Sequence, residues 1–101
     1  MFDMSQISNN YFAAKIAFEE DDGTVKEYEL EINQAKTSHF KELISAKTID
    51  DVISALSKIF SRNKTHFTVT VEMLENFEYP ALIALKDAYL HWLNETRKAK
   101  N

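Results

Sequence analysis

The chain has 101 residues, 45% of them hydrophobic, which suits a single domain at residues 1–101 with a core of its own. It contains no cysteine and one glycine, which excludes disulfides, thiolate chemistry and a glycine-rich phosphate loop. The net charge of −4 is uneven, since residues 1–32 hold eight of the 16 acidic and two of the 12 basic residues, a pattern that disfavours direct nucleic-acid binding.

After an N-terminal arm at residues 1–10, the pattern predicts an acidic β-hairpin at residues 11–32. Apolar and polar residues alternate on both sides of Gly23, as in strands with one buried face. The two apolar faces must coincide, and a slip of one residue would turn every side chain over. The register that we expect pairs Phe18 with Tyr28, Ile16 with Leu30, and Ala14 with Ile32.

A helical pair is predicted at residues 38–62. Its second helix opens at Thr48, whose side chain is expected to cap the backbone near Asp51. Apolar residues then recur at helical spacing up to Phe60. The helix therefore has one continuous face to bury.

Alternation returns at residues 66–74, which predicts a third strand, and residues 77–98 are rich in helix formers, which predicts a C-terminal helix. The element order is β-β-α-α-β-α. We therefore expect an α+β fold in which a small three-stranded antiparallel or mixed sheet is packed by helices.

Candidate chemistry is sparse. Asp87, His91 and Glu95 lie four residues apart, which places two carboxylates and an imidazole along one helix face. Such stripes are typical of a solvated helix surface. We predict no catalytic, metal-binding or cofactor-binding residue, and hence a protein that is not an enzyme.

The hairpin carries the first candidate binding surface. Its outward positions and its tip concentrate carboxylates, which attract basic proteins and repel nucleic acid. A solvent-facing strand also needs polar residues for solubility, which is the plainer interpretation. The predicted partner-binding residues are Glu19, Glu20, Asp21, Asp22, Glu27, Glu29 and Glu31.

The predicted C-terminal helix carries the second candidate binding surface. Its apolar residues sweep a wider arc than one packing face needs. Either the helix is wedged between several elements, or the surplus surface binds a partner or a second copy in a homodimer. The predicted residues of this surface are Ile83, Leu90 and Trp92.

These features favour a non-catalytic protein-binding module. In size, acidity and lack of motifs the chain resembles small phage inhibitors and regulators of the anti-defence or immunity-protein class, which implies docking on a basic surface, such as that of a nucleic-acid-binding protein. The alternative is a phage tail-assembly chaperone or other assembly factor that uses the apolar helix. With neither a signal-like start nor about 18 consecutive apolar residues, we expect a cytoplasmic protein without membrane contact.

Overall fold

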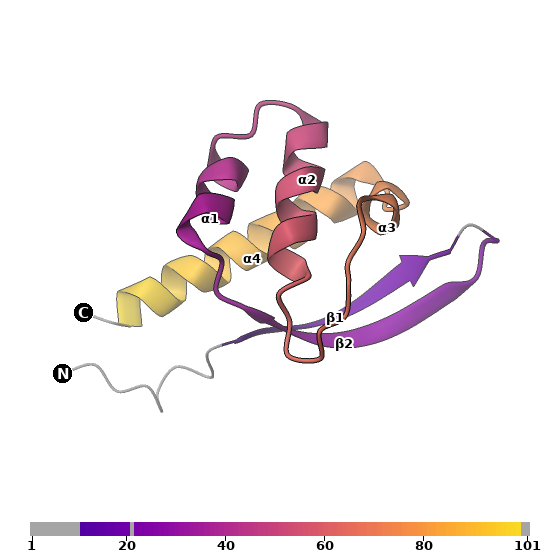
Figure 1. Cartoon of the computed structure of the whole chain (residues 1–101), viewed down its shortest axis with the longest axis horizontal. Helices are drawn as coiled ribbons and strands as arrows, with labels where there is room; N and C mark the ends of the chain where they lie inside the picture. The colour runs from indigo at the N-terminus through magenta and orange to yellow at the C-terminus, as the bar shows by residue number, and fades with distance from the viewer. Residues whose placement is uncertain (1–10, 21, 100–101) are drawn as a thin grey trace.

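The computed structural model describes residues 11–20 and 22–99, which form an α+β fold with a two-stranded antiparallel sheet and four helices (Figure 1). The hairpin comes first and the helices follow it. In chain order the elements are β1 (Tyr11–Glu19), β2 (Val25–Asn33), α1 (Thr37–Ile44), α2 (Ile49–Phe60), α3 (Val71–Glu75) and α4 (Tyr79–Ala99).

A tight turn joins the two strands. The N–H of Glu20 donates to the C=O of Thr24 (2.7 Å), and the N–H of Gly23 donates to the C=O of Glu20 (2.9 Å). Gly23 has a φ of 88°, a left-handed conformation that glycine adopts without a steric penalty. The only glycine of the chain thus lies where the turn requires it.

The observed register differs from the predicted one by two residues. Phe18 lies opposite Lys26, Ile16 opposite Tyr28, and Ala14 opposite Leu30. The expected pairing was wrong because the compact turn lets the strands pair as far as Glu19 and Val25. A shift of two residues keeps every side chain on its predicted face, since the pleat has a period of two.

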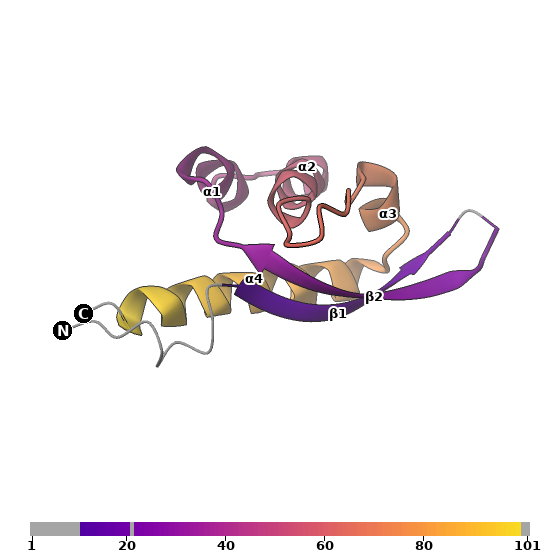
Figure 2. The ribbon, with the colours of Figure 1, turned by 60° about the horizontal axis from the view of Figure 1, so that its bottom comes forward.

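The helices cover one face of the hairpin and one of its edges. Figure 2 shows α1, α2 and α3 side by side over one face, while α4 runs along β1. As predicted, the Thr48 hydroxyl accepts a hydrogen bond from the N–H of Asp51 (3.1 Å) and caps α2. The helices leave the opposite face of the hairpin exposed to solvent.

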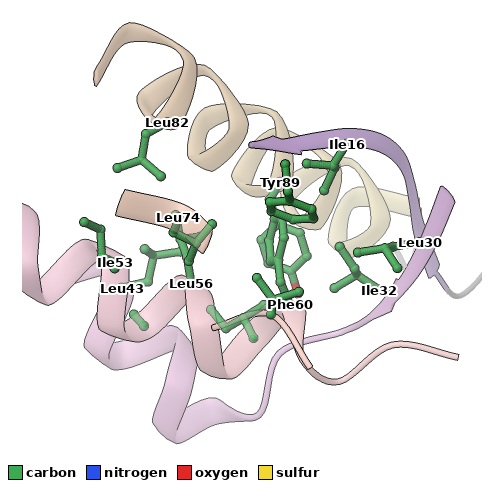
Figure 3. Packing of buried hydrophobic residues seen from close by; sticks show 14 residues of the cluster. Ile16, Leu30, Ile32, Leu43, Ile53, Leu56, Phe60, Leu74, Leu82 and Tyr89 are labelled. Atoms are coloured by element: carbon green, nitrogen blue, oxygen red, sulfur yellow. The ribbon is translucent and has the colours of Figure 1, made fainter. Parts of the chain in front are cut away.

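Buried side chains from both strands and all four helices form one hydrophobic cluster (Figure 3). At its centre Tyr89 of α4 lies 5.4 Å from Phe60 of α2 and 5.3 Å from Phe12 of β1, measured between ring centroids. The Tyr89 hydroxyl donates to the C=O of Asn33 (2.9 Å). One residue therefore ties α4 to the sheet and to α2.

The predicted third strand at residues 66–74 is absent: residues 66–70 are irregular and the following residues form α3. The alternation marked burial only in part: Val69 is fully buried and Phe67 partly so, whereas Val71 is exposed. However, Val69 has no neighbouring strand. Its N–H donates to Ser61 Oγ (2.9 Å), and its C=O accepts from Ser57 Oγ (2.7 Å) and Ser61 Oγ (3.1 Å).

Two further features prevent a strand in this segment. His66 adopts a φ of 60°, which interrupts an extended path. Thr70 then caps α3 by accepting from the N–H of Met73 (3.2 Å). Side-chain hydrogen bonds thus replace the ladder that the alternation predicted.

We expect Ser61→Ala to lower the free energy of unfolding by about 1–3 kcal/mol, because it leaves the buried N–H of Val69 without an acceptor. Ser57→Ala is the matched control, since the C=O of Val69 keeps its bond from Ser61. Its cost should be about 1 kcal/mol or less. Urea denaturation checks both, and equal losses would show that the N–H bond is not the decisive one.

Candidate protein-binding face

The open face of the hairpin combines small and acidic side chains. All its residues are exposed, and β1 contributes Ala13, Lys15 and Ala17 while β2 contributes mainly glutamates. We call this surface the open face; it consists of Ala13, Lys15, Ala17, Glu19, Val25, Glu27, Glu29 and Glu31. Four of the predicted partner-binding carboxylates therefore share one surface.

Lysines neutralise part of the open face. Lys15 Nζ lies 3.6 Å from Glu27 Oε1, and Lys64 Nζ lies 3.8 Å from Glu31 Oε2. Both pairs are well exposed, so each contributes at most about 1 kcal/mol and is weakened by salt. Within the described residues Glu29 and Glu19 form no ion pair, which leaves the face net negative.

The other predicted carboxylates lie at the tip of the hairpin. Glu20 pairs with Lys26 (3.5 Å), whose side chain is on the helix-covered side of β2. The N–H of Thr24 donates to Asp22 Oδ1 (2.9 Å). Hydrogen bonds from the backbone and then the side chain of Thr24 lower the pKa of Asp22 below its ordinary value. The carboxylate of Asp22 therefore bonds to the backbone of the turn itself. Asp21 lies outside the described residues.

The apolar residues predicted on α4 are distributed differently. Trp92 packs on Phe12 and Tyr89, with ring centroids 5.9 Å and 5.6 Å away. Ile83 and Leu90 are half-buried. Much of the wide apolar arc is therefore used within the fold, because α4 is wedged against the sheet and α2.

A shallow groove remains between α1 and the C-terminal half of α4. Its volume is about 400 Å³, and its lining includes Phe40 of α1 and Leu90 and Leu93 of α4. Gln34 and Ala35, from the segment that joins β2 to α1, also line it. Sequence patterns gave no indication of this groove, because they do not place α1 against α4.

The three histidines do not converge. His91 is exposed on α4, His66 is exposed in the loop before α3, and His39 on α1 has a buried Nδ1 without a hydrogen-bond partner in the described part of the chain. Asp87 pairs with Lys86 (3.6 Å). Among the described residues, no three His, Cys, Asp or Glu side chains are grouped closely enough to hold a metal ion.

Two parts of the open face escaped sequence reasoning. Lys64 reaches Glu31 only because the loop after α2 bonds to the end of β2, where the N–H of Lys64 donates to the C=O of Glu31 (2.9 Å). Ala13 and Ala17 were visible as outward positions, and their small size is the signal that was overlooked. At these two positions β1 presents only a methyl group beside a longer glutamate of β2, whereas Lys15 and Glu19 are the long side chains that β1 adds to the face.

No protein-family model matches the chain, and the searches of curated proteins and of solved structures found no similar protein either. Across residues 11–20 and 22–99, none of the helices combines the length and the apolar character needed to cross a membrane.

Proposed function

We propose that the protein is a non-catalytic binding module that docks the open face of its hairpin on a basic surface of another protein. The observation that carries the proposal is the gathering of Glu19, Glu27, Glu29 and Glu31 on one exposed face of the hairpin. A basic partner would be drawn to such a surface by long-range attraction and held by ion pairs. Inhibitors and regulators of nucleic-acid-binding proteins are the class that this chemistry fits best.

The shape of the face supports the same function. Ala13 lies opposite Glu31 and Ala17 opposite Glu27, so the residue directly across the sheet from each of these two glutamates carries only a methyl group. A partner's lysine or arginine can lay its methylene stem over the alanine and reach the carboxylate with its charged end. The intramolecular pair of Lys15 with Glu27 is exposed and easily exchanged for a partner's cation.

Reversing three charges tests the proposal. A tagged protein with Glu27→Lys, Glu29→Lys and Glu31→Lys should fail to capture the partner that the unchanged protein captures from a lysate of its host. Capture by the unchanged protein should also fall between about 0.15 M and 1 M salt, over which the Debye length shrinks from about 8 Å to about 3 Å. Immunoblotting or mass spectrometry of the captured protein provides the measurement.

The matched control reverses three exposed carboxylates elsewhere, with Glu72→Lys, Glu75→Lys and Asp87→Lys. Because its total charge is the same, this variant should still capture the partner if the open face is the site. Salt-independent capture that survives reversal of the open face would contradict the proposal. If that capture were lost on Leu90→Ser, the groove beside α4 and the role of an assembly factor would replace it.

A further inference from the structure

Within residues 11–20 and 22–99, backbone hydrogen bonds reach the edge of β2 that faces away from β1 only near the end of the strand. In Figure 1, α4 runs beside β1, whereas beyond β2 the described chain places only the loop that follows α2. That loop covers the end of the strand: the N–H of Asn33 donates to the C=O of Arg62 (2.8 Å), and the N–H of Lys64 donates to the C=O of Glu31. The part from Val25 to Leu30 has no such cover.

The hydrogen-bonding pattern of the hairpin shows which backbone N–H and C=O groups of β2 point away from β1. Residue pairs that exchange hydrogen bonds alternate with pairs that do not, and the bond from Glu20 to Thr24 makes the even-numbered residues the bonding ones. Glu27 and Glu29 are odd-numbered, so they direct their N–H and C=O groups outward. Within residues 11–20 and 22–99 nothing hydrogen bonds to these groups.

The charges of the same residues restrict what can pair with this edge. Side chains directly opposite each other in a sheet lie on the same face, and like charges there are unfavourable. Pairing of β2 with β2 of a second copy would set glutamates against glutamates. An extended segment with basic residues at every second position would instead place a cation beside Glu27 and another beside Glu29.

We propose that the partner of this protein adds a basic, extended segment to the free edge of β2 as an antiparallel third strand. This inference rests on the proposed function and specifies its binding mode: backbone bonds to Glu27 and Glu29 supply part of the affinity, and the alternating cations supply the specificity. Between its cations the segment carries apolar residues, which face Tyr28 and Phe67 on the helix-covered side, where the two rings lie 4.5 Å apart.

A peptide of five Lys-Val repeats is the probe. A lysine opposite Glu27 would exchange both backbone bonds with it, so the lysine N–H groups face β2 and the valine N–H groups face away. N-methylation of the lysines should therefore weaken binding by roughly tenfold or more, as the loss of two hydrogen bonds implies, whereas N-methylation of the valines should leave it nearly unchanged. The three peptides have the same charge, so electrostatic attraction is matched.

Calorimetry on the full chain gives the affinities, and amide hydrogen exchange followed by NMR locates the bonds. Slower exchange at Glu27 and Glu29, together with the predicted order of the peptides, supports the inference. Equal binding of all three peptides with unchanged exchange at these amides would overturn it, and so would a failure of all three to bind. Neither result would touch the proposed function, which is decided separately by capture with the charge-reversed open face.

Discussion

Replacing Asn63 by alanine should lower the free energy of unfolding by about 2–4 kcal/mol. Asn63 is buried, with 2% of its surface exposed. Its Nδ2 donates to the C=O of Phe60 (2.8 Å) and of Phe67 (2.7 Å), and its Oδ1 accepts from the N–H of Phe67 (2.8 Å) and the hydroxyl of Thr65 (3.1 Å). Alanine would remove these partners from the backbone groups of Phe60 and Phe67, which lie at a buried or partly buried site.

Asn76→Ala is the control for this variant. Asn76 makes one exposed bond, from its Nδ2 to the C=O of Glu19 (2.9 Å), and water can replace it. We expect a loss of about 1 kcal/mol or less. Guanidinium denaturation followed by circular dichroism gives both values. Similar losses in the two variants would show that the buried bonds of Asn63 contribute little.

The second large effect is expected at Tyr89. Tyr89→Ala should cost about 3–5 kcal/mol, because it removes a fully buried ring from between Phe12 and Phe60 and leaves a cavity. Tyr89→Phe keeps the ring and removes only the bond to the C=O of Asn33, so it should cost about 1 kcal/mol. Thermal and urea unfolding of the pair separate packing from hydrogen bonding. If Tyr89→Phe were as costly as Tyr89→Ala, the central role of the ring would be wrong.

Tyr89→Phe and the unchanged protein should respond differently to high pH. Burial raises the pKa of the Tyr89 hydroxyl above its ordinary value of 10.0. Above pH 10 the folded protein therefore keeps this proton, whereas the unfolded chain releases it. The contribution of this group to stability is therefore complete below pH 10 and is lost as the pH rises towards the higher pKa of the folded state. Unfolding measured at pH 9 and pH 11 should show a smaller decrease for Tyr89→Phe than for the unchanged protein.

The period of the apolar residues predicted which side chains are buried better than it predicted secondary structure. In the hairpin, period two gave the correct faces, and an error of two residues in register left them intact. At residues 66–70 the same period correctly marked Val69 as buried. The strand was wrong because the hydroxyl groups of Ser57 and Ser61, brought there by α2, bind the backbone that a neighbouring strand would have bound.

The candidate surfaces were predictable to different degrees. The open face follows from the alternation of residues within β1 and β2, so local sequence was sufficient. The groove beside α4 and the free edge of β2 depend on which helices and strands become neighbours in the fold. Local patterns of apolar and polar residues do not determine those neighbours. Trp92 shows the difference: its apolar character was evident, but its place beside Phe12 depends on contact between two ends of the chain.

The anchoring of the hairpin has a consequence for the thermodynamics of recognition. An isolated two-stranded hairpin is barely stable in water, yet here Phe18 packs on Phe67 and Phe77 near the tip, and Asn76 binds the last residue of β1. The chain entropy of the binding surface has thus been lost during folding and is not lost again when a partner arrives. A preorganised edge of this kind favours a modest entropic cost of association, and leaves most of that cost to the partner's segment.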